Sequence, residues 1–253
     1  MTNISLTISE AIAEIKLCRP HRMNAVTLEL LKDLREAIDT VNQNDQINVI
    51  ILSGEGKAFC AGVDLREIEA NSTDVSSGSV GELLDEHANG VIKALERSPK
   101  AVISKINGHC FTGGLEIALA ADLIYVAKDA KLADTHAVLG FRPSWGLSQR
   151  LPRRVSLMRA KELSFTAQII TGEQAKEYGL ALECFPKEKL DAEVLSIAKK
   201  ISGNSPNSIR AYKDLYKAFQ NNGLQPGLEY EANTHYDIPE VKQRVMEFLK
   251  RLR

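Results

Sequence analysis

The sequence has few of the residues that build covalent or metal-bound scaffolds. Its 253 residues include only four cysteines, Cys18, Cys60, Cys110 and Cys184, and no two of them form a Cys-x-x-Cys pair. Such wide spacing is not typical of zinc sites or of the disulfide frameworks of secreted proteins. We therefore expect no metal site and a reducing compartment, which for this chain means the cytoplasm.

The chain also has no surplus of charge and no long apolar run. Lysine and arginine number 32 against 33 acidic residues, for a formal net charge of −1. Without a basic surplus we expect no nucleic-acid partner. The N-terminal MTNISLTISE does not have the basic and apolar segments of a secretory signal, and the longest apolar runs, which Glu116 and Asp122 interrupt, are too short to span a membrane.

The hydrophobic pattern predicts an α/β protein of ordinary composition, with 44% hydrophobic and 26% charged residues. Short apolar or alternating runs predict strands, and apolar residues at helical spacing predict helices from Thr27 and over 80–95. Their alternation indicates βα crossover units. The polar stretch 69–79 suggests a mobile loop, and from Ala160 onward we expect helices alone. The expected strands are 4–8, 11–17, 47–54, 101–108 and 122–127, and the expected C-terminal helices are 160–167, 173–178, 188–202, 205–220 and 240–252.

One carboxylate stands in an unusual place, within HCFTGGLEIALAAD at residues 109–122. Glu116 is the only charged residue between Lys105 and Asp122, and two adjacent glycines precede it. A helix N-terminus leaves backbone N–H groups unpaired, and Gly113 would let a substrate oxygen approach one of them. Such a donor can stabilise an oxyanion, and the N–H of Ala61 in KAFCAGVDL is a candidate for a second donor. From these residues alone, Glu116 fits a surface position on a short amphipathic helix equally well.

The order and spacing of five segments extend this pattern over nearly the whole chain. They are RPHRMNAVT, KAFCAGVDL, NGHCFTGGLEIALAADLIYVA, LGFRPSWGLSQRLPRRVS and TGEQAKEYGLA. Together they resemble the crotonase family, the enoyl-CoA hydratase/isomerase superfamily. The resemblance implies a ClpP/crotonase-like α/β fold, with repeated ββα units forming a spiral core over residues 1–190. It also implies a helical region over 191–253 that assembles a homotrimer or a dimer of trimers.

The resemblance assigns functional residues as well. It implies that the N–H groups of Ala61 and Gly113 hold the thioester carbonyl of an acyl-CoA, and that Glu116 is a catalytic acid/base. An apolar pocket would raise the pKa of this carboxyl toward neutrality. Coenzyme A is part of the substrate, so no separate cofactor is expected. The residues implied to contact it are Arg22, Ala61, Gly62, Asp64 and Leu65.

The sequence departs from the two-carboxylate hydratase pattern at one position. Such hydratases carry a second glutamate twenty residues after the first, and here that residue is His136. Either His136 or Asp134, two residues earlier, is a candidate for the second catalytic group. The alternatives are a packed core histidine and an aspartate that caps a turn. Further on, Ser144 and the only tryptophan, Trp145, replace small residues, and Trp145 either walls off the acyl pocket or packs in the core.

The favoured activity is hydration of a 2-enoyl-CoA to a 3-hydroxyacyl-CoA through a thioester enolate. Double-bond isomerisation or dehydration of a hydroxyacyl-CoA would use much of the same site. A different class of function is a non-catalytic family member that binds acyl-CoA or RNA. RNA binding would depend on the basic stretch LPRRVSLMRAK at 151–161, which is explained more simply as a helix start with solvated arginines.

Overall fold

The larger of two β-sheets forms the spine of the molecule. A computed structural model of the chain describes residues 2–70, 74–221 and 223–252. The six strands of this sheet lie in the order β1-β2-β3-β5-β7-β10. β1 pairs with β2 in antiparallel fashion, and every other neighbouring pair is parallel. The strands are β1 (Ile4–Ser9), β2 (Ile12–Leu17), β3 (Val49–Gly54), β5 (Ala101–Ile106), β7 (Leu123–Ala127) and β10 (Glu183–Phe185).

A second sheet of four short strands holds the order β4-β6-β8-β9. Its strands are β4 (Ala58–Cys60), β6 (His109–Phe111), β8 (Lys131–Ala133) and β9 (Ile170–Thr171). Three times in succession a strand of the large sheet is followed by a strand of the small sheet and then a helix. The three units are β3-β4 with α2 (Leu65–Ala70), β5-β6 with α4 (Gly113–Leu119) and β7-β8 with α5 (His136–Leu139). This is the repeated ββα unit predicted from the resemblance.

Amphipathic helices cover the large sheet. α1 (Leu28–Gln43) begins where the Thr27 hydroxyl accepts the N–H of Leu30, which satisfies one of the unpaired donors of the first turn. Its apolar face is buried, and α3 (Glu82–Glu96) packs beside it. α9 (Lys187–Ser202) contacts β2, β3, β5, β7 and β10, so it crosses most of the sheet. Because α9 spans the expected boundary at residue 190, the core continues past it.

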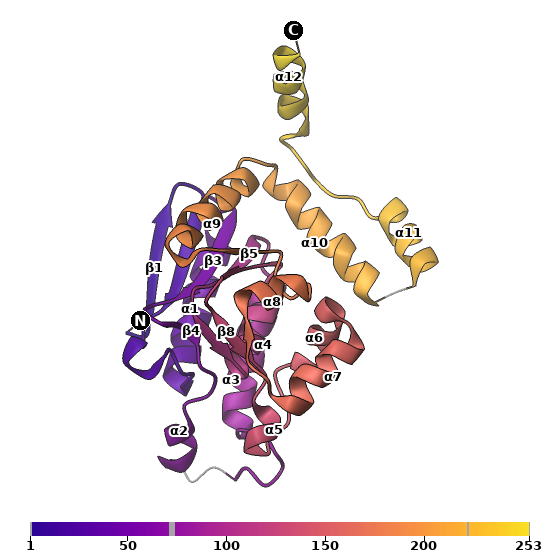
Figure 1. Cartoon of the computed structure of the whole chain (residues 1–253). Coiled ribbons are helices and arrows are strands. Elements are labelled where there is room, and N and C mark those ends of the chain that lie inside the picture. The colour runs from indigo at the N-terminus through magenta and orange to yellow at the C-terminus, as the bar shows by residue number, and fades with distance from the viewer. Residues whose placement is uncertain (1, 71–73, 222, 253) are drawn as a thin grey trace.

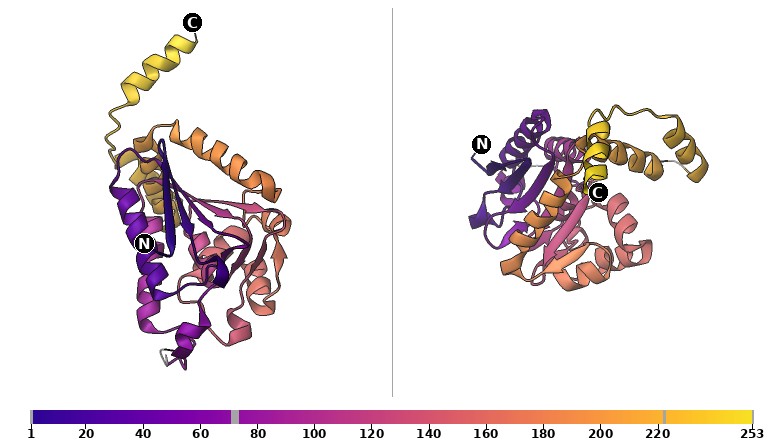
Figure 2. Two further views of the ribbon diagram at one scale, coloured as in Figure 1. Left: turned by 90° about the vertical axis from the view of Figure 1, so that its left-hand side faces the viewer. Right: turned by 90° about the horizontal axis from the view of Figure 1, so that it is seen from above.

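The remaining helices lie toward the C-terminus. α6 (Leu147–Val155), α7 (Leu157–Thr166) and α8 (Gly172–Glu177) stay on the body of the molecule. α10 (Pro206–Asn221) is joined to the body by Lys213, which bonds the Lys100 carbonyl and Asp122. α11 (Leu224–Asn233) and α12 (Val241–Arg251) extend away from the body (Figures 1 and 2). Within the described ranges, no helix has both the length and the apolar character needed to cross a membrane.

The expectation of helices alone after Ala160 is wrong, because β9 and β10 lie in that part of the chain. Both strands have only two or three residues, too few for an alternating pattern to be recognised. The expected loop at 69–79 begins later than predicted, since residues 69 and 70 belong to α2. Residues 71–73 of that stretch lie outside the described residues.

A close contact between α4 and the small sheet leads to the first prediction. A Cβ atom at Gly114 would lie 2.3 Å from the carbonyl oxygen of Cys60 in β4, so Gly114→Ala must push the helix away from the strand. We expect the free energy of unfolding to fall by roughly 1–3 kcal/mol in urea denaturation followed by circular dichroism. Gly227→Ala in α11 is the matched control, because a Cβ there meets nothing within 4 Å. Equal losses in the two variants would contradict the packing argument.

Candidate active site

The site lies where three neighbouring short strands end. β4, β6 and β8 are parallel, with Cys60 paired with Cys110 and Phe111 paired with Ala133. The segments that follow these strands therefore leave the sheet at the same edge. They enclose a pocket of about 80 Å³. Its lining residues are Ala61, Val63, Leu65, Val80, Thr112, Gly113, Glu116, Thr135, His136, Leu139, Phe141, Ser144 and Trp145.

Glu116 is buried in the first turn of α4. Its residue surface is 1% exposed, and its Oε1 accepts the backbone N–H groups of Trp145 and Leu147, each at 3.0 Å. Burial raises the pKa of this carboxyl from 4.5 to about 7, although the two N–H groups and His136 act in the opposite direction. The expected rise toward neutrality is confirmed. Near pH 7 the carboxyl is therefore present in both protonation states.

His136 faces Glu116 across the pocket, with its Nε2 3.7 Å from Glu116 Oε2. Its other ring nitrogen, Nδ1, lies 2.7 Å from Oδ1 of Asp134, which also accepts the backbone N–H of His136 at 3.1 Å. Burial opposes the charge of Asp134, but the hydrogen bonds from His136 and Ser164 outweigh it and lower the pKa of this carboxyl. An ionised carboxylate only accepts hydrogen bonds, so Nδ1 carries a proton and Nε2 is the ring nitrogen that faces Glu116.

Asp134, the other candidate for the second catalytic group, is not among the residues that line the pocket. Asp134 faces a small interior cavity of about 10 Å³, together with apolar residues such as Leu132 and Leu163. Its carboxylate therefore acts through the imidazole, whose tautomer and orientation it fixes. Of the two candidates, His136 is the one that lines the pocket beside Glu116.

Gly113 presents one backbone donor to the pocket. It is the first residue of α4, where N–H groups have no partner inside the helix. The preceding Thr112 has a φ of +48°, and its hydroxyl accepts the N–H of Thr135 at 3.2 Å, which holds this turn in place. A Cβ at Gly113 would lie 2.5 Å from Cζ3 of Trp145. Glycine is therefore required here because the indole packs against its backbone.

The expected second donor, Ala61, has its N–H engaged elsewhere, and Val63 is the candidate in its place. The N–H of Ala61 donates to the carbonyl of Met23 at 3.0 Å, so it is already used. Val63 lies opposite Val26 in a parallel bridge. The hydrogen bonds of this bridge come from the neighbours of Val63: the Gly62 carbonyl accepts the N–H of Val26, and the N–H of Asp64 donates to the Val26 carbonyl. The N–H of Val63 therefore points away from Val26. A Cβ at Gly62 would lie 3.5 Å from the nitrogen of Gly113, so the two loops are in contact beside the pocket.

The residues expected to contact coenzyme A are distributed around the same loop. Gly62 has a φ of +90°, which turns the chain between Ala61 and Val63, and Leu65 begins α2 at the pocket wall. The Asp64 carboxylate forms an ion pair with Arg19 at 3.0 Å, so it organises the loop from within. Arg22 lies exposed on the short helix η1 (Pro20–Arg22), one residue before Met23.

The basic stretch at 151–161 is engaged in packing. Arg154 donates to the carbonyls of Ala121 at 2.9 Å and Asp122 at 3.5 Å, just beyond the end of α4. Arg159 lies 4.0 Å from the ring centroid of Tyr178 and pairs with Glu162. Among the residues that the structure describes, no group of three or more histidine, cysteine or acidic side chains could hold a metal ion.

Sequence reasoning missed Asp85, which binds the segment that holds Glu116. Its Oδ1 accepts the indole N–H of Trp145 and the hydroxyl of Ser144, each at 2.7 Å. Asp85 is one of several acidic residues on the amphipathic α3, and no local pattern separates it from the solvent-facing ones. The unusual Ser144-Trp145 pair was the one available signal, because a buried indole N–H needs an acceptor.

The chain matches a family profile described as Enoyl-CoA hydratase/isomerase over residues 7–252. It is 35% identical over 222 residues to the peroxisomal Delta(3,5)-Delta(2,4)-dienoyl-CoA isomerase of Arabidopsis thaliana, which covers 85% of this chain and 80% of that protein. It is 32% identical over 236 residues to the crotonyl-CoA hydratase of Syntrophomonas wolfei, which covers 93% of this chain and 87% of that protein.

A solved structure gives the same result in three dimensions. The crystal structure of an enoyl-CoA hydratase from Bacillus anthracis superimposes with a TM-score of 0.86 at 34% identity, covering 91% of this chain and 88% of that one. Since the profile and these relatives span nearly all of the sequence, the chain belongs to the enoyl-CoA hydratase/isomerase family and has its crotonase fold.

Proposed function

We propose that the protein hydrates a 2-enoyl-CoA thioester to the 3-hydroxyacyl-CoA. The observation that carries this proposal is the pair of proton-transfer groups in one pocket, Glu116 Oε2 and His136 Nε2, 3.7 Å apart. Hydration adds a proton and a hydroxyl group across a double bond, so it needs two such groups. The relationship to the crotonyl-CoA hydratase of Syntrophomonas wolfei supports the same reaction.

The backbone donors stabilise the charge that develops during the addition. In this proposal the thioester carbonyl oxygen accepts the N–H groups of Gly113 and Val63. When water attacks C3, the π electrons of the C2–C3 double bond move toward the carbonyl, and that oxygen becomes enolate-like. Fixed N–H donors bind this oxygen more strongly in the transition state than in the substrate, which lowers the barrier.

The two side chains then divide the proton transfers. Nε2 of His136 accepts the proton of the attacking water, and the ionised Asp134 stabilises the imidazolium that results. The protonated form of Glu116, which its raised pKa keeps populated near pH 7, delivers a proton to C2. After product release, the imidazolium returns its proton to Glu116 across the 3.7 Å contact, and the site is restored.

A second candidate is isomerisation of the acyl double bond. The relationship to the dienoyl-CoA isomerase of Arabidopsis thaliana favours it. Glu116 in its ionised form could take a proton from one carbon and return it to another while the same N–H groups hold the enolate. This reaction uses one proton-transfer group, so it would not need Nε2 of His136.

We also propose that the protein is a homotrimer or a dimer of trimers in the cytoplasm. All four cysteines are free thiols, which supports a reducing compartment.

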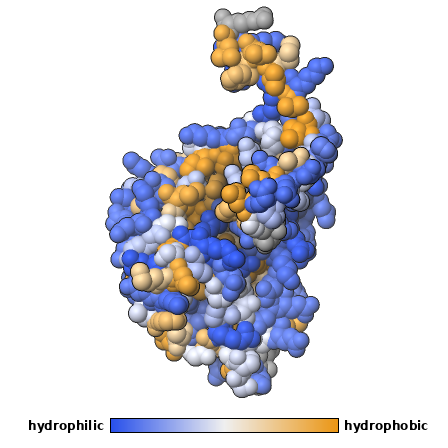
Figure 3. Space-filling view, turned by 90° about the vertical axis from the view of Figure 1, so that its right-hand side faces the viewer, coloured by the Kyte–Doolittle hydropathy of each residue, from blue (hydrophilic) through white to orange (hydrophobic). Residues whose placement is uncertain are grey.

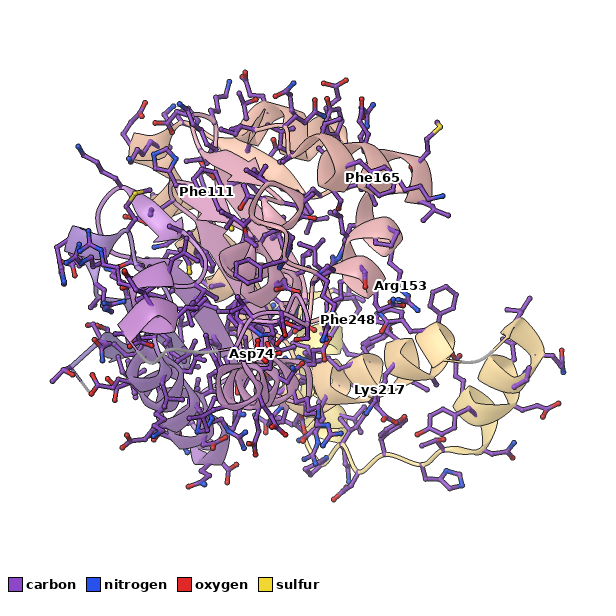
Figure 4. All side chains as sticks on the ribbon, turned by 90° about the horizontal axis from the view of Figure 1, so that it is seen from below. Asp74, Phe111, Arg153, Phe165, Lys217 and Phe248 are labelled. Carbon is purple, nitrogen blue, oxygen red and sulfur yellow. The ribbon has the colours of Figure 1, made fainter. Side chains whose placement is uncertain are left out.

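The assembly is argued from α12, which has eleven residues and extends from the body with hydrophobic side chains on its surface (Figure 3). The exposed fraction is 51% for Val245, 62% for Phe248 and 49% for Leu249. A helix this short is marginal in water by itself, so its apolar face needs a partner surface. Figure 4 shows α10, with Lys217, and α11 on the same outer side of the molecule. We assign a second copy of the chain as that partner.

Loss of the Glu116 proton should abolish hydration. With crotonyl-CoA as substrate, we expect Glu116→Gln to lower kcat/KM by about 10²–10⁴, measured by the decrease of enoyl absorbance. For the unaltered protein, the rate should fall as pH rises above about 7, because the raised pKa of Glu116 marks the loss of its acidic proton. Glu36→Gln, at an exposed position of α1, is the control. A rate that instead rises through pH 7 would contradict the acid role of Glu116.

Variants of His136 separate the two candidate reactions. We expect His136→Ala to lower hydration of crotonyl-CoA by about 10²–10⁴ and to leave isomerisation of a 3-enoyl-CoA substrate nearly unchanged. Asp134→Asn should cause a smaller loss, mainly in kcat, because an amide can still orient the ring but does not stabilise the imidazolium. Both activities are followed by chromatography of the CoA products. Equal losses of hydration and isomerisation in His136→Ala would contradict the division of roles.

A charge on the apolar face of α12 should disrupt the assembly. We expect the unaltered protein to sediment as a trimer or a multiple of it, and Phe248→Glu to shift the mass toward the monomer in analytical ultracentrifugation. Lys242→Glu on the same helix changes charge without removing an apolar side chain, and it should leave the mass unchanged. A monomeric unaltered protein, or an assembled Phe248→Glu variant, would show that another surface or no surface is used.

A further inference from the structure

Trp145 lies directly against both parts of the catalytic machinery. It is 1% exposed, and its backbone N–H donates to Glu116 Oε1. A Cβ at Gly113 would approach three atoms of the indole, Cζ3 at 2.5 Å and Cε3 and Cη2 at 3.2 Å each. The six-membered half of the indole therefore packs on the residue that donates to the thioester carbonyl. The same side chain also lines the pocket.

α3 fixes the orientation of this indole through Asp85. The carboxylate accepts the indole N–H and the Ser144 hydroxyl through Oδ1, each at 2.7 Å, while Oδ2 accepts the hydroxyl of Ser79. One turn later on α3, Asn89 donates to the backbone carbonyl of Ser144 at 3.2 Å. Hydrogen bonds to an ionised group are among the stronger ones in proteins, so the indole is tightly held.

A second connection to α3 holds the other side of the same loop. The Arg150 guanidinium donates to the carbonyl of Trp145 at 2.8 Å and pairs with Glu96 at 2.7 Å. Rotation of the indole out of the pocket would leave its N–H without the Asp85 acceptor, which is unfavourable for a buried donor. The position of Trp145 is therefore determined from both ends of α3.

The space left beside the indole is small. The pocket has a volume of about 80 Å³, far below the roughly 300–1,000 Å³ of pockets that enclose drug-sized ligands. Val80, Leu139 and Phe141 add apolar side chains to the same wall. Because the indole packs on Gly113 and lines the same pocket as Glu116, an acyl chain bound between these two residues would lie beside the indole.

We propose that Trp145 restricts the acyl pocket to short chains such as butanoyl, and that Asp85 is the positioning residue that holds the indole in place. This inference rests on the proposed binding of acyl-CoA thioesters at this site. It does not depend on which reaction follows, because chain length is selected by the shape of the pocket.

Saturated acyl-CoA thioesters test the inference without catalysis, since they have no double bond to hydrate or move. We expect isothermal titration of the full chain to give a butanoyl-CoA affinity at least about tenfold higher than that of octanoyl-CoA. Trp145→Ala should remove or reverse this preference. Trp145→Phe retains most of the ring volume without the N–H group, so it should keep part of the preference. Equal affinities in the unaltered protein, or an unchanged preference in Trp145→Ala, would overturn the proposal.

Asp85 is tested through the tryptophan itself, because Trp145 is the only one in the chain. In Asp85→Ala, we expect the emission to shift to longer wavelength and the preference for butanoyl-CoA to weaken. Asp85→Asn retains an oxygen acceptor, so it should restore both properties at least in part. An Asp85→Ala variant with unchanged emission and unchanged preference would exclude the positioning role.

The same titrations distinguish this inference from the proposed reaction. A butanoyl preference that depends on Trp145, in a protein without activity on crotonyl-CoA, would support the pocket inference and contradict hydration. Hydration of crotonyl-CoA by a protein without chain-length preference would support the proposed reaction and contradict the pocket inference.

Discussion

The buried contact between Glu116 and the backbone of residues 145–147 organises the whole site. A carboxyl group with 1% of its residue surface exposed needs hydrogen-bond donors, and it finds them in the N–H groups of Trp145 and Leu147. These two donors limit the penalty of burial without removing it, so the pKa stays at about 7. The contact also brings the indole of Trp145 onto Gly113. One interaction therefore sets the acidity of Glu116, shapes the pocket and requires glycine at position 113.

The small sheet places the remaining groups relative to that contact. Because β4, β6 and β8 are parallel and adjacent, their carboxyl ends deliver Val63, Gly113 and His136 to one edge. Each group reaches the pocket on a short turn held by nearby bonds, such as the Asp64–Arg19 ion pair and the Thr135–Thr112 hydrogen bond. The large sheet and its helices then act mainly as a rigid support. This arrangement explains how loops of ordinary sequence can hold two backbone donors in fixed positions.

The parts of this arrangement that could be predicted from the sequence are those carried by pattern over many residues. The alternation of strands and helices predicted an α/β protein. The resemblance of five segments to the crotonase family implied the fold and the roles of Glu116 and Gly113, and His136 was found as the departure from that family's pattern. The sequence could not show that Val63, and not Ala61, is the candidate for the second donor. That depends on the φ of +90° at Gly62 and on the hydrogen bond from the Ala61 N–H to the carbonyl of Met23, 38 positions earlier in the sequence. The role of Asp85 depends on α3 packing beside residues 144–146, a tertiary contact without a local signature. Likewise, β9 and β10 form because neighbouring strands offer them partners, not because of their own residues.

The imidazole at position 136 has a consequence for the charge of the site. If two carboxyl groups stood 3.7 Å apart in such a pocket, their repulsion would force one to remain protonated. Here the Asp134 carboxylate lies behind the ring, and the imidazole is the group that faces Glu116. Burial raises the pKa of Glu116, and the charge of Asp134 raises it further, whereas the nearby His136 lowers it. The Asp134–His136–Glu116 chain thus places two different kinds of proton-transfer group side by side in one pocket. In the proposed hydration, this difference lets the imidazole act as the base toward water while the Glu116 carboxyl acts as the acid.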